Sequence, residues 1–409
     1  MRVSHGPFLR RVLPLVLAAS LAGSAGVARA TTWHVPGDAE TIQGGIDLAA
    51  PGDDVIVGPG TYLESGIRMK SGVLLHSEAG PEATIVDGQR LNAIFYCVDC
   101  AEQAVIDGFT IRNGQSSDGY WGGFLCERSL VAIRDCIIRD SWPDAIVILD
   151  TSDVEVEGCR IEGCHAALFT EWSIVRVTDC VVRDNRYGLG GYAFDLTVSR
   201  CVITRNVPDD GEGWGIGVGL CQLRVEDTEV TANRGSGIML SESTSSIIGC
   251  TIAHNWVVNG EFSGGIVPEY STVHLERTIV YGNEGAYSDN CPPGSAYCSL
   301  IRSRCDDLGG NFWEDPLFCD AEGGDYRLDA LSPCLPGNHP DGDDCGLIGA
   351  YGMGCSTHGA CCVAETCILG NQQDCDGEYL GDGVACDPNP CVASATQSTT
   401  WGRLRSMFR

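Results

Sequence analysis

The sequence predicts an all-β protein whose short strands stack as the coils of a parallel β solenoid. Blocks of similar sequence recur every 21 to 28 residues between Phe109 and Thr278. These blocks lack the 3.6-residue apolar period of a helix, and each contains short runs typical of strands. A repeat of this length cannot bury an apolar face alone, so neighbouring repeats must stack to form one continuous core.

Composition narrows the classes of function. The 409 residues include 26 Lys and Arg against 55 Asp and Glu, which gives a formal net charge of -29. Such a charge repels polyanions, and we therefore expect no nucleic-acid partner. Hydrophobic residues make up 44% of the chain, which argues against disorder. The 23 cysteines exceed what a cytosolic chain carries without a metal or redox motif.

Residues 1–30 are expected to be a cleaved signal peptide. Three arginines precede an apolar run over 12–22, and Ala28 and Ala30 fit a small-x-small cleavage site. That run is too short to span a bilayer, and no later stretch approaches eighteen apolar residues. We expect a secreted or cell-surface protein with no transmembrane segment, in a compartment that permits disulfides.

The repeats are expected to fill residues 105–290. Each block centre is preceded, 13 or 14 residues earlier, by a second short strand that begins with Gly or Ala. One aligned apolar position in each block predicts a single inward-facing ladder: Ile138, Ile161, Val182, Ile203, Val230, Ile252 and Val280. Asparagines recur five residues after the centre, at Asn185, Asn206, Asn233, Asn255 and Asn283. Asn tolerates a left-handed backbone, and its amide can bond the same group one coil away.

Five cysteines occupy block centres: Cys136, Cys159, Cys180, Cys201 and Cys250. Stacked coils would hold their Cβ atoms about 4.8 Å apart, which is longer than a disulfide favours. We therefore expect a ladder of buried free thiols rather than disulfides.

With these repeats, the chain resembles the right-handed parallel β-helix proteins of the pectin-lyase-like superfamily, in particular secreted bacterial members. Residues 41–62 match the helix-then-strand pattern that covers the open end of the solenoid in such proteins, where a β edge would otherwise be exposed. Residues 315–334 resemble the closing segment of many secreted members. The resemblance implies an N-terminal helical cap with the first coils over 31–104, and C-terminal coils with a cap over 291–355. Because the superfamily includes lyases, hydrolases, epimerases and non-enzymes, it does not decide the activity.

Residues 356–392 are expected to form a small disulfide-rich module. Their cysteines are interleaved with Gly and Asp, and His358 is the only histidine near them, which disfavours a metal site. The connectivity cannot be deduced from the sequence. Residues 393–409 follow as a polar linker and a basic tail, which is either an attachment signal or a frayed terminus.

Three connections are longer than the rest, and all fall at the same corner of the repeat: 109–123, 201–215 and 250–265. They carry acids and aromatic rings, and two more candidates lie near the far end of the adjacent strand. Aromatic faces stack on sugars, and acids bond hydroxyls or hold Ca²⁺, although exposed turns also collect such residues without function. The candidate ligand-binding residues are Asp118, Tyr120, Trp121, Glu171, Trp172, Trp214, Trp256 and Glu261.

Catalytic candidates are sparse. In each repeat, the residue expected to face outward just after the Gly or Ala of the second strand is not titratable, and the eight histidines do not align at that position. The hydrolase and epimerase motifs of the superfamily are absent. Asp209, Asp210 and Glu212 remain as weak candidates. We expect a carbohydrate-binding or adhesion module with no assured cofactor, no assigned metal ligands, and Ca²⁺ as a candidate ion. The alternative is a polysaccharide lyase or glycoside hydrolase that acts on acidic polysaccharide. A purely structural assembly component is a third hypothesis.

Overall fold

The computed structural model describes residues 29–116, 119, 121–208, 213–257, 264–285, 292–302, 306–356, 358–372, 375–386 and 389–391. The chain divides into two compact units, residues 1–30 and 31–409, and all the strands of the described residues belong to the second. The expected signal peptide lies almost entirely outside the described residues. Within the described part of the chain, no helix is long and apolar enough to cross a membrane.

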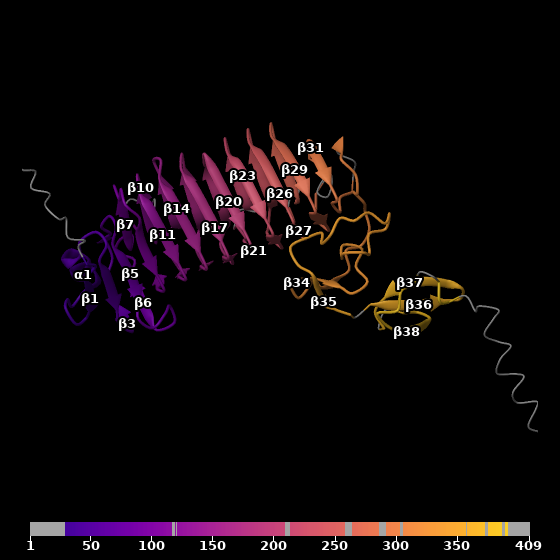
Figure 1. Cartoon of the computed structure of the whole chain (residues 1–409), viewed down its shortest axis with the longest axis horizontal. Helices are drawn as coiled ribbons and strands as arrows, with labels where there is room; N and C mark the ends of the chain where they lie inside the picture. The colour runs from indigo at the N-terminus through magenta and orange to yellow at the C-terminus, as the bar shows by residue number, and fades with distance from the viewer. Residues whose placement is uncertain are drawn as a thin grey trace, which may run out of the picture. The chain divides into compact units, whose positions relative to one another are not determined.

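Three parallel sheets confirm the all-β solenoid (Figure 1). The thirteen-stranded sheet stacks β1 (Thr32–Val35), β2 (Asp54–Val57), β5 (Leu74–Ser77), β8 (Ala104–Asp107), β11 (Leu130–Arg134), β14 (Asp153–Glu157), β17 (Ile174–Thr178), β20 (Asp195–Ser199), β23 (Gln222–Glu226), β26 (Thr244–Ile248), β29 (Thr272–Glu276), β31 (Gly294–Tyr297) and β32 (Asp306–Asp307). The nine-stranded sheet stacks β4 (Ile67–Arg68), β7 (Phe95–Val98), β10 (Phe124–Glu127), β13 (Asp144–Leu149), β16 (Ala166–Glu171), β19 (Tyr187–Tyr192), β22 (Trp214–Gly219), β25 (Ser236–Ser241) and β28 (Ile266–Glu269). The ten-stranded sheet stacks β3 (Gly60–Tyr62), β6 (Thr84–Asp87), β9 (Thr110–Arg112), β12 (Ile137–Arg139), β15 (Arg160–Glu162), β18 (Val181–Arg183), β21 (Val202–Thr204), β24 (Glu229–Thr231), β27 (Thr251–Ala253) and β30 (Ile279–Tyr281).

Each full coil has three strands, whereas the sequence pattern predicted two. The block around Cys136, which looked like one strand, is divided between β11 and β12. The division falls at Asp135, whose left-handed backbone (φ 47°) turns the chain from the thirteen-stranded to the ten-stranded sheet. The block centres therefore lie at a corner of the coil.

The predicted apolar ladder is confirmed. All seven side chains from Ile138 to Val280 are fully buried, and they belong to one continuous core that extends along the solenoid. Alternation along each strand places every second side chain in this core, as expected for sheets with one buried face.

The corner between the ten-stranded and nine-stranded sheets carries the predicted asparagine ladder. The Nδ2 group of each Asn donates to the Oδ1 atom of the next: 3.1 Å from Asn185 to Asn206, 2.9 Å from Asn206 to Asn233, and 3.0 Å from Asn233 to Asn255 and from Asn255 to Asn283. The same side chains also bond backbone groups of the preceding coil, such as Ile203 O, 3.0 Å from Asn233 Nδ2. The ladder thus satisfies buried polar groups at a turn.

The corner between the thirteen-stranded and ten-stranded sheets carries the cysteine ladder. All five block-centre cysteines are buried free thiols, as predicted. The Cys159 backbone N–H points to the Cys180 Sγ atom at 3.4 Å, and the Cys180 N–H points to the Cys201 Sγ atom at 3.5 Å. Thr228 replaces cysteine in the next coil, where its Oγ1 accepts from the Cys201 N–H.

The third corner, between the nine-stranded and thirteen-stranded sheets, carries a ladder that the sequence analysis missed. Buried serines accept hydrogen bonds from backbone N–H groups one coil away: Ser152 from Ser129 at 3.1 Å, Ser173 from Ser152 at 3.2 Å, and Ser271 from Ser243 at 2.9 Å. Each corner is therefore closed by its own row of small polar or thiol side chains.

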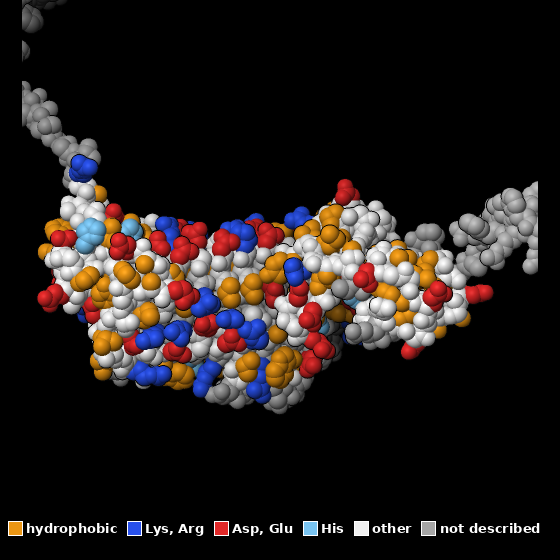
Figure 2. All heavy atoms as spheres, turned by 90° about the horizontal axis from the view of Figure 1, so that it is seen from below, with side chains coloured by type: hydrophobic (Ala, Val, Ile, Leu, Met, Phe, Trp, Pro, Cys, Tyr) orange, Lys and Arg blue, Asp and Glu red, His pale blue; other side chains and the backbone are white. Residues whose placement is uncertain are grey.

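Arginines and acids pair on the outer faces of the coils. Arg183 bonds Glu162 at 2.9 Å, Arg200 bonds Asp179 at 2.7 Å and Arg205 bonds Asp184 at 3.0 Å, each across neighbouring coils. Figure 2 shows basic and acidic side chains intermingled over one such face. These exposed pairs each contribute little to stability, but they explain how an acidic chain uses its arginines.

The N-terminal region contains a short helix, α1 (Ile42–Leu48). Thr41 caps it by accepting from the Gly44 N–H, and the Glu64 carboxylate accepts from the Ile42 N–H at 2.8 Å. Ile42 and Ile46 are buried in the solenoid core. A helix thus stands where the resemblance implied a cap.

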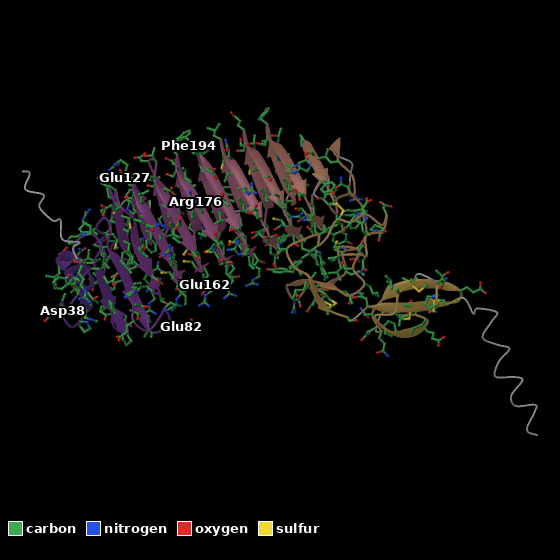
Figure 3. The ribbon with its side chains drawn as sticks, viewed as in Figure 1. Asp38, Glu82, Glu127, Glu162, Arg176 and Phe194 are labelled. Carbon is green, nitrogen blue, oxygen red and sulfur yellow. A yellow bond between two sulfur atoms is a disulfide. The ribbon has the colours of Figure 1, made fainter. Side chains whose placement is uncertain are left out.

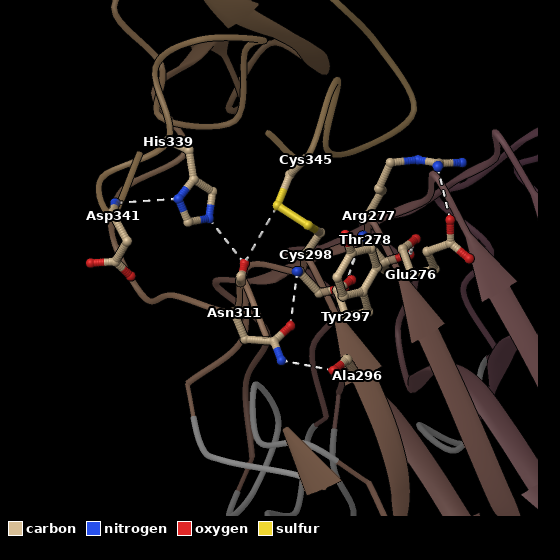
Figure 4. Close-up of a disulfide and its surroundings, with 12 residues drawn as sticks. Glu276, Arg277, Thr278, Ala296, Tyr297, Cys298, Asn311, His339, Asp341 and Cys345 are labelled. Carbon is tan, nitrogen blue, oxygen red and sulfur yellow. Dashed lines mark hydrogen bonds and ion pairs between the residues drawn. A yellow bond between two sulfur atoms is a disulfide. The ribbon is translucent and has the colours of Figure 1, made fainter. Parts of the chain in front are cut away.

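The C-terminal coils are tied to the segment that follows them. The Cys298–Cys345 disulfide joins the corner after β31 to a later loop, next to Asn311 and His339 (Figure 4). Asn311 accepts from the Ser299 N–H at 2.9 Å and donates to Ala296 O at 2.8 Å. A second disulfide, Cys319–Cys355, links two strands of a small sheet formed by β33 (Phe318–Asp320), β34 (Asp325–Asp329) and β35 (Met353–Cys355).

The cysteine-rich module is stapled by disulfides, as predicted. Its strands β36 (Gly359–Val363), β37 (Thr366–Gly370) and β38 (Glu378–Asp382) form an antiparallel sheet. Three disulfides connect Cys361 to Cys375, Cys362 to Cys391 and Cys367 to Cys386. The linker and basic tail lie outside the described residues.

Candidate functional site

The three long connections all lead from the ten-stranded sheet into the nine-stranded sheet, as the spacing predicted. They precede β10, β22 and β28. Between β10 and β22 lie β13, β16 and β19, so Trp121 and Trp214 are separated by four strand spacings, or about 19 Å. The candidate residues therefore extend along the sheet instead of sharing one pocket.

A pocket of about 430 Å³ lies on the outer face of the nine-stranded sheet. Val147 and Phe169, from neighbouring strands, belong to its apolar lining. Two candidates from the sequence, Trp121 and Glu171, line it together. The full lining is Gly119, Trp121, Pro143, Asp144, Val147, Leu149, His165, Phe169 and Glu171.

The same pocket contains a pair that the sequence analysis did not identify. His165 Nδ1 lies 3.1 Å from Asp144 Oδ1, with the side chains 33% and 15% exposed. The alignment considered positions just after each Gly or Ala, whereas Asp144 is the first residue of β13 and His165 directly precedes β16. When Asp144 accepts from Nδ1–H, the other ring nitrogen, Nε2, is left as the acceptor of a neutral imidazole.

His165 of this pocket also belongs to a row of rings, one from each of four successive coils. Centroid distances are 5.1 Å from Trp142 to His165, 5.2 Å from His165 to Tyr187, and 4.9 Å from Tyr187 to Trp214. We call these four residues the aromatic row. The Arg186 guanidinium lies over the Trp142 ring at 5.0 Å. Trp214 was predicted from the sequence, and the other three rings were missed because they do not recur at one fixed position of the repeat.

Two glycines seat the Trp214 ring against the sheet. A Cβ atom at Gly217 would lie 2.6 Å from the Trp214 ring, and one at Gly190 would lie 3.0 Å from its Nε1 atom. Both glycines occupy outward positions that the sequence analysis had noted only as non-titratable. Their function is to let an aromatic ring lie flat on two adjacent strands.

The remaining candidates lie elsewhere. Trp172 is 44% exposed at the opposite corner of the sheet, after β16. Trp256, in the third connection, is 38% exposed and lies under the Arg234 guanidinium at 5.3 Å. The other six candidates fall outside the described residues: Asp118, Tyr120, Asp209, Asp210, Glu212 and Glu261.

The two acids of this pocket are too far apart for glycosidase chemistry with two carboxylates. Asp144 pairs in register with Ala166, five residues before Glu171, so the two acids lie about 17 Å apart along the strands. Glycosidase carboxylates stand about 5 to 9.5 Å apart. Over the described ranges, no three His, Cys, Asp or Glu residues are grouped so that they could hold a metal ion.

Residues 71–221 match the family model of the right-handed β-helix region. The crystal structure of pectate lyase Pel9A is similar to this chain with a TM-score of 0.54 and 10% identity, covering 80% of this chain and 98% of that one. The fold is that of a right-handed parallel β-helix.

Two A-modules of mannuronan C-5 epimerases from Azotobacter vinelandii also resemble this β-helix. The AlgE4 module has a TM-score of 0.39 and 12% identity and covers 64% of this chain and 91% of its own. The AlgE6 module has a TM-score of 0.34 and 15% identity and covers 67% and 94%. A search of curated proteins finds no match. At 10% identity, the likeness to the pectate lyase structure shows the fold of the β-helix and nothing of its chemistry.

Proposed function

We propose that the protein is an exported polysaccharide-binding protein, acting as a cell-surface or extracellular binding or adhesion module. The ligand lies on the outer face of the nine-stranded sheet. The observation that carries this proposal is the aromatic row beside the 430 Å³ pocket. Ring faces stack on the apolar faces of sugars, and the carboxylates of Asp144 and Glu171 can accept hydrogen bonds from hydroxyls.

Three further observations support this proposal. The row advances by one ring per coil, about 4.8 Å, so a polymer along the axis meets repeated contacts. The described disulfides favour an oxidising, extracellular compartment. The neighbour that shares the fold is, by its name, a pectate lyase, which is consistent with a polysaccharide as the class of ligand.

A matched pair of tryptophans tests the binding face. Trp142 belongs to the aromatic row and Trp256 does not, yet each is 38% exposed and each lies under an arginine. On a glycan array followed by titration calorimetry, we expect Trp142→Ala to weaken binding about tenfold, or about 1.4 kcal/mol. Trp256→Ala should bind as wild type. The proposal fails if wild type binds no glycan or if both variants lose the same affinity.

A second candidate function, a polysaccharide lyase or glycoside hydrolase, is favoured by the His165–Asp144 pair. An imidazole held by a carboxylate is suited to proton transfer. Incubation with pectin, alginate and other uronic polymers, with and without Ca²⁺, would reveal new unsaturated or reducing ends. We expect His165→Gln to abolish any such turnover. If turnover survives His165→Gln, the acids Asp209, Asp210 and Glu212 become the candidates to replace next.

A further inference from the structure

Three exposed aromatic residues lie at the other edge of the nine-stranded sheet. At the corner toward the thirteen-stranded sheet, Trp172 is 44% exposed, Tyr192 is 51% exposed and Phe194 is 50% exposed. The Trp172 and Phe194 rings come from consecutive coils, with centroids 5.6 Å apart at 52°. We call these three residues the corner strip. Figure 3 shows Phe194 at the same outer edge of the solenoid as Glu127.

The fold does not require an aromatic residue at this turn. Trp172 precedes the ladder serine Ser173 and has a left-handed backbone, with φ 49°. The residues that precede four other ladder serines share this conformation: three are polar, Arg128 (φ 49°), Thr151 (φ 61°) and Glu242 (φ 48°), and one is aromatic, Tyr270 (φ 50°). The turn therefore forms with polar as well as aromatic side chains, so the exposed ring of Trp172 is not needed to close it.

A glycine also seats part of the strip. A Cβ atom at Gly219 would lie 2.8 Å from the Tyr192 ring, so this ring lies over the next coil. The strip therefore presents its rings across the outer ends of β16, β19 and β22. Tyr187, in the aromatic row, and Tyr192 are at opposite ends of β19, five residues or about 17 Å apart.

The charges around the strip restrict its ligand. Glu171 pairs in register with Tyr192, and Asp195 directly follows Phe194. The nearby Arg176 is bonded to Asp153 of the preceding coil. The surroundings are therefore acidic, on a chain with a formal net charge of -29, and both repel anionic polymers, anionic lipid surfaces and a second copy of this chain.

We infer that the corner strip is a second glycan-binding site, which takes the ring faces of an uncharged polysaccharide. Aromatic rings stack on the apolar faces of hexoses, while the carboxylates of Glu171 and Asp195 accept hydrogen bonds from their hydroxyls. An uncharged polymer supplies both interactions without repulsion. This inference shares the carbohydrate ligand class and Glu171 with the proposed function, but it depends on different aromatic residues at a different edge of the sheet.

The test compares a double variant, in which Trp172 and Phe194 are both replaced by Ala, with the single variant Tyr270→Ala. Tyr270 directly precedes the ladder serine Ser271, just as Trp172 precedes Ser173. Its backbone φ is 50° and its side chain is 92% exposed. Affinity electrophoresis through xyloglucan, mixed-linkage glucan and hydroxyethylcellulose, with polygalacturonate as the anionic comparison, measures retardation. We expect the double variant to lose affinity for an uncharged polymer about tenfold, Tyr270→Ala to bind as wild type, and all variants to keep the wild-type melting temperature.

Three outcomes would overturn the inference. The first is that none of the uncharged polymers retards the wild type. The second is that the double variant binds as tightly as the wild type, and the third is that Tyr270→Ala loses as much affinity as the double variant. Trp142→Ala, measured in parallel, separates this site from the aromatic row. If Trp142→Ala has no effect while the double variant loses affinity, the corner strip stands and the proposed binding face fails. The reverse result rejects only the strip.

Discussion

Single buried side chains determine how each corner of the solenoid is closed. Asn233 is fully buried, accepts from the Asn206 N–H at 3.1 Å, and donates both to Ile203 O and to Asn255 Oδ1. Its spacing made this residue predictable, because an amide that bonds its counterpart one coil away must recur with the repeat. His165 and Asp144 were not predictable in the same way, since a pair that occurs once leaves no period in the sequence.

Removal of one ladder amide should destabilise the solenoid strongly. Asn233→Ala leaves the Asn206 N–H and Ile203 O buried without partners, and we expect a loss of about 2–4 kcal/mol in the free energy of unfolding. Denaturant unfolding measures this loss. Gln222→Ala, which removes an exposed amide from β23, should change it by no more than about 0.5 kcal/mol. Equal effects would show that the ladder is dispensable.

Glu229 gives stability a pH dependence. It is 6% exposed and accepts from the Thr231 Oγ1 atom at 2.6 Å, and its burial raises the pKa of the carboxyl. When the folded-state pKa of a group is raised, its contribution to the stability of the fold is fully present at a pH below its ordinary pKa. That contribution is lost as the pH rises through the folded-state pKa. We expect Glu229→Gln to melt higher than wild type at neutral pH, with the gain disappearing at acidic pH. A gain that stays constant with pH, or one that exposed Glu242→Gln reproduces, would contradict this.

At the scale of elements, the repeat length was predictable and the strand count was not. The period follows from the block centres, but a left-handed residue such as Asp135 divides an apparently continuous strand between two sheets. Asp is also common within turns of other kinds, so the bend has no distinct signature. The long connections were placed at the correct corner, since insertions interrupt a fixed period.

The seat of Trp214 on the nine-stranded sheet can be tested through Gly217. A Cβ atom there would lie 2.6 Å from the ring, so Gly217→Ala should lift the indole from β22. We expect a changed near-ultraviolet circular dichroism spectrum and weaker glycan binding at the aromatic row. Gly352→Ala is the control, because a Cβ atom at that glycine has no neighbour within 4 Å. An unchanged spectrum would show that the ring is not held by the sheet.

Across the whole molecule, the described cysteines fall into two populations that the sequence had indicated. Eleven are buried free thiols, and ten form disulfides at Cys298 and beyond. Spacing predicted the stacked thiols, because neighbouring coils hold them too far apart to bond. The pairing in the module could not be predicted, since it depends on how three short antiparallel strands are arranged.

The buried thiols should be inert in the native protein. Burial raises the pKa of the Cys250 thiol and of the Cys164 thiol to about 12, which suppresses the reactive thiolate. We expect none of the eleven to react with Ellman's reagent until guanidinium chloride unfolds the chain. Thr244→Cys, at an exposed position of β26, should add one rapidly reacting thiol. Rapid native reaction of more than that one would contradict the burial.

The cysteine ladder also sets an order of events for an exported chain. In an oxidising compartment, a thiol remains reduced only if it is buried before the oxidant reacts with it. The solenoid coils precede the disulfide-bonded segment in the chain, so they are available to close first, while the cysteines of the later module are still to arrive. We therefore expect packing to protect the early thiols before oxidation joins the later cysteines, with Cys334 as a later thiol that burial also keeps free.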